Sequence, residues 1–367
     1  MTLSPRGSAL RWVATGLHRA GLMRPLAMAA AFAGGPRAFQ IHTYHRVNDE
    51  SDPFCPAVPT AVFAQRMAYI ARTYCVLTVE ELVGRAREGR MPRNALAITF
   101  DDGYRDNLTH AAPILVRYGL RATIFLTTGL IGTPDVPWFD RVAMAFKRTQ
   151  PSSVRAPWGK LLNLDTQAER LEAWTRALAH LKRVSDDELR DGVEKLCDAL
   201  AVALPSGEDP QMLSWEEVRR LQQMGFAIGA HTVNHPVLSR VSPQRAWTEI
   251  TEARDAITAA CGSAPRAFAY PNGGPEDYTE EVKGMVREAG FTCAATTRFG
   301  LNTRDTCAYE LRRGGPWEDN LPVYAMKLMW YGLHSGYRKD SGGPRRDVFR
   351  SGSSVHTQRQ EESACKC

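Results

Sequence analysis

The chain has 367 residues, of which 44% are hydrophobic and 23% charged, as in an ordinary globular protein of one large or two smaller domains. The net charge of +6 is uneven, because residues 1–46 hold six arginines and no acidic residue, while 335–367 carry +3. Subtracting both ends leaves −3 for residues 47–334. A mildly acidic body argues against a nucleic-acid-binding protein, which would present a basic face.

Residues 1–37 are predicted to form a basic N-terminal helical segment. Arg19, Arg24 and Pro25 interrupt its apolar stretches, so it is too broken to span a bilayer and lacks the core of a signal peptide. Two interpretations stay open. The segment packs as a helix on the domain, or it makes peripheral contact with an anionic membrane face.

Eight cysteines are scattered along the chain without a CxxC pair. A disulfide framework normally occurs in a small, cysteine-dense protein, so we expect most of them to be reduced and buried. This favours a cytoplasmic location, with association at the inner membrane face if the N-terminal segment binds lipid.

Residues 38–334 are predicted to form the main α/β domain. Capping boxes at Thr78 with Glu81 and at Ser214 with Glu217 mark helix starts. Apolar runs alternate with such helices, which predicts parallel strands with helices outside and chemistry at the carboxyl ends of the strands. The runs suggest a closed or nearly closed barrel of seven strands, at 39–45, 96–100, 122–127, 226–231, 267–270, 292–296 and 307–311.

Two segments depart from this alternation. Residues 135–212 have no strand-like run but contain leucines and Trp174 at helical spacing, which predicts a helical insertion between the third and fourth strands. It either packs on itself or covers the site as a lid. Residues 335–367 are rich in Gly, Ser and Arg, and we expect this tail to be disordered.

Polar residues follow three of the predicted strands. "TFDDG" places Asp101 and Asp102 side by side, where their repulsion calls for a cation unless they form a simple turn. "HTVNH" places His231 and His235 four residues apart, on one face if the turn is helical. Two histidines and one carboxylate with open positions would suit a hydrolytic Zn²⁺ site, or another divalent first-row metal.

These segments, with "RAFAYPNG" at 266–273, resemble the first three motifs of the polysaccharide deacetylases, the NodB-homology family of carbohydrate esterases. The resemblance implies a distorted seven-stranded (β/α) barrel and metal-dependent removal of N-acetyl groups from amino sugars. It implies that Asp102, His231 and His235 bind the metal. Asp101 would then be the catalytic base, and Arg266 would orient it.

The resemblance also implies a substrate pocket. The backbone amide of Tyr104 would help hold the oxyanion, and Tyr270 and Pro271 would line the sugar site. The histidine that protonates the leaving amine in many members is missing near the end of the barrel, where 291–330 contain no histidine. His45 is the best replacement, although a structural or substrate-contacting role stays open.

"ELRRGG" at 310–315 places Arg312 and Arg313 near the end of the last predicted strand, where either could touch substrate. The expected reaction is N-deacetylation of N-acetylhexosamine units in a bacterial polysaccharide or a lipid-linked precursor. Two alternatives remain. One is a related amidase acting on a small non-sugar amide, and the other is a glycan-binding module that has lost catalysis.

Overall fold

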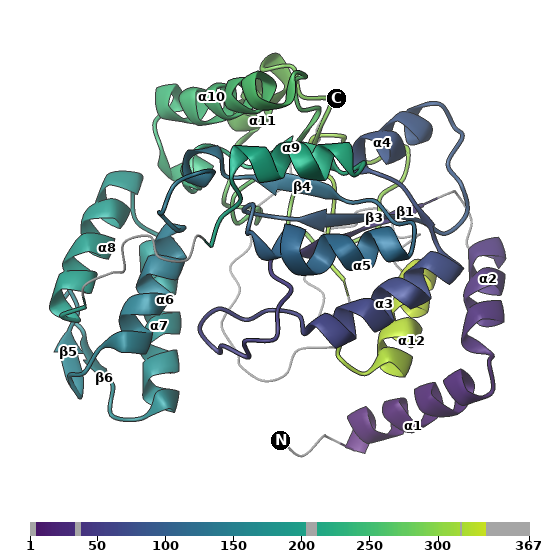
Figure 1. Ribbon diagram of the computed structural model, residues 1–367, viewed down its shortest axis with the longest axis horizontal. Helices are drawn as coiled ribbons and strands as arrows, with labels where there is room; N and C mark the ends of the chain where they lie inside the picture. Colours follow the sequence, from purple (N-terminus) through teal and green to yellow (C-terminus); the bar gives the residue numbers. More distant parts are fainter. Residues whose placement is uncertain (1–4, 34–37, 203–210, 316–317, 335–367) are drawn as a thin grey trace.

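The strands of the main sheet all run parallel to their neighbours. This computed structural model describes residues 5–33, 38–202, 211–315 and 318–334. The strands pair in the order β1-β3-β4-β7-β8-β9, and β2 pairs with β3. The sheet curls into a half-barrel with helices outside (Figure 1). Its strands are β1 (Phe39–Tyr44), β2 (Cys75–Val76), β3 (Ala95–Phe100), β4 (Thr123–Leu126), β7 (Ala227–Ala230), β8 (Ala267–Ala269) and β9 (Cys293–Ala295).

Helices follow most of these strands, and the predicted capping boxes at Thr78 and Ser214 are both confirmed. The α-helices are α1 (Pro5–Arg19), α2 (Met23–Ala33), α3 (Thr60–Thr73), α4 (Val79–Arg87), α5 (Ala112–Arg117), α6 (Trp138–Arg148), α7 (Gln167–Leu181), α8 (Asp186–Ala199), α9 (Trp215–Gln223), α10 (Pro243–Cys261), α11 (Glu280–Glu288) and α12 (Leu321–His334). Short turns of other helix types are η1 (Asn107–Ala111), η2 (Thr128–Leu130) and η3 (Leu238–Arg240).

Alternate residues of each strand face opposite sides of the sheet. In β3, Leu96, Ile98 and Phe100 pack against the helices, whereas Ala95 and Ala97 belong to a second cluster that fills the inside of the curl. The inner residues of β8 and β9 are also small, chiefly alanine. The inside of the curl is thus apolar along the strands, where Phe39, Ile41 and Phe125 join the alanines.

The predicted seventh strand at 307–311 is wrong. Backbone turns at 303–306 and 307–310 take the chain out of the extended conformation. The segment 307–311 forms a single β-bridge, Leu311 with Ala295 of β9, and one further bond from the Ala294 amide to the Ala308 carbonyl. The gap between β9 and β1 is instead bridged by single contacts, such as the Gly314 amide to the Ile41 carbonyl at 3.0 Å. A loop therefore takes the place of the last strand.

The insertion between β4 and β7 contains helices α6, α7 and α8, which stand beside the half-barrel (Figure 1). Its hydrophobic cluster is separate from those of the barrel. The expectation that 135–212 lacks strands is wrong, because β5 (Ser153–Arg155) and β6 (Leu161–Asn163) pair as an antiparallel hairpin. Each strand buries one residue between two exposed ones, which leaves too short a pattern to detect.

The predicted tail at 335–367 lies outside the described residues. The cysteines that are described, at positions 55, 75, 197, 261, 293 and 307, are free thiols, of which Cys197 and Cys293 are buried and Cys75 is exposed.

The separate cluster predicts that the insertion can lose stability on its own. Phe146 is fully buried in it, so Phe146→Ala should destabilise the insertion by about 3–5 kcal/mol through lost burial and a residual cavity. Hydrogen exchange should accelerate in α6, α7 and α8 and stay unchanged in β3 and β4. The exposed Val116→Ala change serves as the control. Equal acceleration throughout the barrel would show that the insertion is not an independent unit.

Candidate metal centre and catalytic site

The site begins where β3 ends. The inward series Ala95, Ala97 and Thr99 continues to Asp101, whose amide donates to the Tyr44 carbonyl at 3.0 Å. Asp102 then adopts a left-handed conformation with φ of 74°, which is uncommon for a residue with a side chain. The turn lets both adjacent carboxylates stay at the site, and both are almost fully buried.

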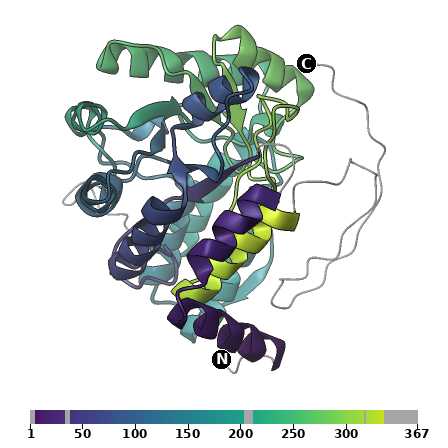
Figure 2. The same ribbon diagram turned by 90° about the vertical axis from the view of Figure 1, so that its right-hand side faces the viewer.

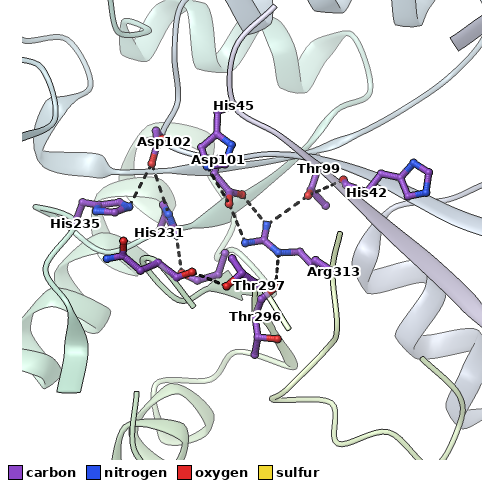
Figure 3. A network of polar contacts seen from close by, with 12 residues as sticks. His42, His45, Thr99, Asp101, Asp102, His231, His235, Thr296, Thr297 and Arg313 are labelled. Atoms are coloured by element: carbon purple, nitrogen blue, oxygen red, sulfur yellow. Dashed lines mark hydrogen bonds and ion pairs between the residues drawn. The ribbon is translucent and has the colours of Figure 1, made fainter. Parts of the chain in front are cut away.

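Asp102, His231 and His235 come together, with one potential ligand atom from each lying within 4.8 Å of the others. The Nε2 atoms of His231 and His235 lie 3.6 and 3.5 Å from Oδ1 of Asp102 (Figure 3). Burial lowers the pKa of His231 to about 4 and that of His235 well below its usual value. Both imidazoles are therefore neutral, as metal ligands must be.

The three residues fit a divalent metal on the evidence of their unpaired atoms. Neither carboxylate oxygen of Asp102 has a hydrogen-bond partner within the described part of the chain, although the side chain is 99% buried. Such a group is strongly unfavourable unless it is neutralised or coordinates a cation. The Ala269 carbonyl accepts a 2.7 Å hydrogen bond from Nδ1 of His231, which leaves the Nε2 lone pair directed toward Asp102.

The turn that carries the histidines is not helical, contrary to one expectation. Thr232 and His235 have φ values of 67° and 58°. The buried Glu249 carboxylate of α10 accepts hydrogen bonds of 2.8 Å from the amides of Val233 and Asn234. These bonds replace helical ones and hold the turn. Nothing near the motif in sequence predicts Glu249, which follows it by more than a dozen residues.

Asp101 has a different partner from the one expected. Arg313 donates from Nη1 to Oδ1 at 2.7 Å and from Nη2 to Oδ2 at 2.8 Å, which is a two-pronged ion pair (Figure 3). The guanidinium is itself held by the Thr296 carbonyl, 2.9 Å from Nε, and it is 99% buried. Arg313 thus orients Asp101, whereas we expected it to touch substrate.

Arg266 does not orient Asp101, and that prediction is wrong. Arg266 is exposed and directly precedes β8, whereas Asp101 follows β3. Because parallel strands all start at one edge of a sheet and end at the other, the start of β8 lies away from the site. The strand assignment alone could have excluded Arg266.

The two carboxylates are electrostatically unlike. Burial would raise the pKa of Asp101, but the Arg313 guanidinium holds it well below its usual range. Burial raises the pKa of Asp102 well above its usual range, and the negative charges of Asp101 and Asp140 add to this. Asp101 is therefore ionised at neutral pH, whereas Asp102 ionises only when a positive charge lies beside it.

An open cavity of about 680 Å³ leads to Asp102. His45 lies on its wall, with Nε2 4.0 Å from Oδ2 of Asp101 and 54% of the side chain exposed. The insertion supplies another part of the wall. Aromatic residues along the cavity are Tyr44, Phe54, Tyr104, Phe139 and Trp174, and polar ones include Arg46, Arg66, Asp140, Glu318 and Asp319.

The predicted pocket residues have different positions. The ring of Tyr104 lines the cavity, and its hydroxyl donates to Oδ2 of Asp140 at 2.8 Å. The role of its backbone amide stays a prediction. Tyr270 is wrong as a lining residue, because it alternates with the inward Ala269, faces the helices and donates its hydroxyl to the Tyr309 carbonyl. Pro271 is buried after β8, and substrate contact by it stays a prediction.

The buried pair predicts a large stability effect at Arg313. Arg313→Met leaves the Asp101 carboxylate buried without its partner and should lower the free energy of unfolding by about 3–5 kcal/mol. The exposed Arg266→Met should change it by less than about 0.5 kcal/mol. Denaturant unfolding of both variants measures the difference. Similar losses in the two variants would contradict the assignment.

The stabilisation that the Asp101–Arg313 ion pair gives to the fold depends on pH. The pKa of Asp101 is depressed by folding, so the pair stabilises the fold fully above the unfolded pKa of about 3.9. Its contribution decreases as the pH falls from there toward the folded pKa. The difference between wild type and Arg313→Met should therefore shrink below about pH 4.

Several known proteins resemble this chain. Residues 88–294, more than half of the chain, match the family model for polysaccharide deacetylase. The relative YxkH of Bacillus subtilis is 21% identical over 280 residues, covering 76% of this chain and 71% of its own. The chitooligosaccharide deacetylase of a Bradyrhizobium strain is 33% identical over 91 residues, 24% of this chain and 39% of that protein.

Solved structures agree on the fold. The Streptococcus pyogenes deacetylase PplD, in complex with acetate, aligns with a TM-score of 0.55 and 19% identity, covering 80% of this chain and 99% of that one. IcaB from Ammonifex degensii aligns with a TM-score of 0.51 and 20% identity, covering 81% and 98%. With the family model matched over the barrel, the chain belongs to the polysaccharide deacetylase family, the NodB-type carbohydrate esterases.

Proposed function

We propose that the protein is a metal-dependent N-deacetylase that removes acetyl groups from N-acetylhexosamine units of a bacterial polysaccharide or its lipid-linked precursor. The observation that carries this proposal is the buried Asp102 carboxylate without hydrogen-bond partners, 3.5 and 3.6 Å from two neutral imidazoles. Zn²⁺ suits such a donor set, and other first-row divalent ions also bind it. A fully assembled set supports catalysis over a binding-only module.

The residues around this centre have separable roles. A bound divalent ion would acidify a water molecule and polarise the acetyl carbonyl. Asp101 would accept the proton of that water, and Arg313 keeps the carboxylate ionised and aimed through its two hydrogen bonds. His45, exposed beside Asp101, would protonate the departing amine. This assigns base and acid to groups whose nitrogen and oxygen lie 4.0 Å apart.

The cavity supports a sugar substrate over a small non-sugar amide. Its volume of about 680 Å³ lies in the range of pockets that enclose a ligand of several rings. Phe139 and Trp174 from the insertion offer flat apolar faces to a sugar ring, and Asp140 offers a carboxylate for hydroxyl groups. The Trp174 ring also packs edge-to-face on Phe54, with ring centroids 5.8 Å apart, which holds it in place at the cavity wall.

Metal binding and turnover should separate between the two aspartates. Asp102→Ala should lose both, because it removes the charged ligand, and His235→Ala should do the same. Asp101→Asn should keep the metal and lose turnover by about a hundredfold or more, because the amide cannot accept the proton. Metal analysis and acetate release from N-acetylglucosamine oligosaccharides measure these effects.

Arg266→Met is the matched control and should retain metal and activity, since Arg266 lies away from the site. Full turnover in Asp101→Asn would refute the assignment of the base. Metal retained at full stoichiometry by Asp102→Ala would refute the metal centre.

The wall of the cavity predicts a binding effect at Trp174. Trp174→Ala should raise KM for an N-acetylglucosamine oligosaccharide about fivefold to tenfold through lost stacking, with kcat little changed. Trp158→Ala is the control, because Trp158 also packs partly buried in the insertion but does not line the cavity. Steady-state kinetics of both variants test this. Equal changes in both would show general damage to the insertion.

A further inference from the structure

Large apolar side chains are exposed on the two N-terminal helices. Helices α1 and α2 both pack on α12, as seen when the molecule is viewed from that side (Figure 2). The residues that bury themselves there are mostly small or flexible: Ala14, Met23 and Ala27. The bulkier residues are left outside, with Trp12 79% exposed, and the others are Val13, Leu22, Leu26 and Met28.

The same helices are positively charged. Arg11, Arg19 and Arg24 are exposed among these apolar residues. No acidic residue occurs before position 47, so no carboxylate in this segment offsets them. This composition differs from the rest of the chain, which is mildly acidic up to residue 334. Exposed tryptophan and leucine with arginine are typical of helices that lie in the headgroup region of a membrane.

The helices suit a surface position on the membrane. Within the ranges that the structure describes, no helix combines the length and the hydrophobicity needed to cross a bilayer. Helix α1 has 15 residues, about 22 Å along its axis, which is enough to insert an apolar edge among headgroups.

We propose that α1, α2 and their connection form a docking surface for an anionic membrane. Trp12, Val13 and Leu22 would enter the interface, and the arginines would contact lipid phosphates. Charge complementarity selects this occupant over a second copy of the chain. A symmetric contact between two copies would bring the arginines of both together with no acidic partner from the segment.

Docking would also bring the cavity close to the membrane. Helix α12, which carries α1 and α2, starts at Leu321, two residues after the cavity residue Asp319. It has 14 residues and so spans about 20 Å. A lipid-linked sugar at the surface would thus be within reach of the site. This consequence rests on the proposed function, whereas the docking itself does not.

Vesicle sedimentation of the full chain tests the proposal. The protein should sediment with phosphatidylcholine vesicles that contain phosphatidylglycerol and not with pure phosphatidylcholine vesicles. The apolar variant Trp12→Ser with Leu22→Ser should reduce binding at least tenfold. The charge variant Arg11→Glu with Arg19→Glu should reduce it by about fivefold or more for each arginine, with the effect weakened by salt.

The controls are other exposed positions, outside the N-terminal helices. Leu161→Ser matches the apolar variant, since Leu161 is 60% exposed on β6, and Arg148→Glu matches the charge variant at the end of α6. Both should bind like wild type. Thermal unfolding checks the fold of each variant, and the charge variant tests the proposal if the apolar one unfolds.

Three results would overturn the proposal. The first is no binding of wild type to vesicles with phosphatidylglycerol. The second is equal binding by the N-terminal variants and their controls. The third is self-association in sedimentation velocity that the apolar variant abolishes, which would make a second copy the occupant. Because no outcome depends on acetate release, failure here is distinguishable from failure of the proposed deacetylase activity.

Discussion

The arrangement of this site depends on the different surroundings of two adjacent buried carboxylates, because a cationic side chain pairs with only one of them. Asp101 forms a two-pronged ion pair with Arg313, which is held by Thr296 and is itself excluded from water. Asp102 has no hydrogen-bond partner among the described residues, and two neutral imidazoles lie 3.5 and 3.6 Å from its Oδ1. One carboxylate is thus held ionised at neutral pH, and the other retains its capacity to bind a cation. Their separate chemical roles follow from this difference.

The departure from a complete barrel makes that ion pair available. A seventh regular strand at 307–311 would point alternate side chains in and out in a fixed register. The chain instead turns twice and forms a single β-bridge, at Leu311. The loop that follows can then direct the long side chain of Arg313 inward to Asp101. The irregular closure and the catalytic geometry are therefore connected.

Different segments of the chain supply the candidate metal site, the cavity wall and the positively charged surface. The barrel holds the candidate metal ligands Asp102, His231 and His235 at its strand ends, and the insertion adds aromatic side chains to the cavity wall. The Tyr104 hydroxyl joins these two parts through its hydrogen bond to Asp140 of α6. The N-terminal residues 1–46 carry a net charge of +6, whereas residues 47–334 carry −3. Attraction to an anionic surface would thus orient the molecule by one end.

Local sequence signals predicted much of this architecture. Hydrophobic runs located β1, β3, β4, β7, β8 and β9, because a buried parallel strand must be apolar on both faces, whereas the two-residue strand β2 and the short hairpin β5–β6 were not predicted. The capping boxes at Thr78 and Ser214 act within four residues and were therefore recognisable. Asp101, Asp102, His231 and His235 were identified because each follows a strand that ends at the same edge.

Strand direction and alternation could have refined that prediction. Arg266 precedes its strand and so belongs to the opposite edge. Tyr270 has the parity of Phe268, which faces the helices, whereas Ala267 and Ala269 face inward. At these two positions the family pattern therefore does not match the strand register of this chain.

The contacts between distant segments become visible only in the tertiary structure. The pairing of Arg313 with Asp101 joins residues more than two hundred positions apart, and Glu249 stabilises a turn from another helix. Such contacts depend on how the chain closes the barrel, and no local periodicity encodes this closure. Which side chains stand at the strand ends can be read from local sequence, because alternation and hydrophobicity act over a few residues. Which of these side chains is neutralised depends on the fold, because a buried charge is stabilised by the groups that lie near it in space.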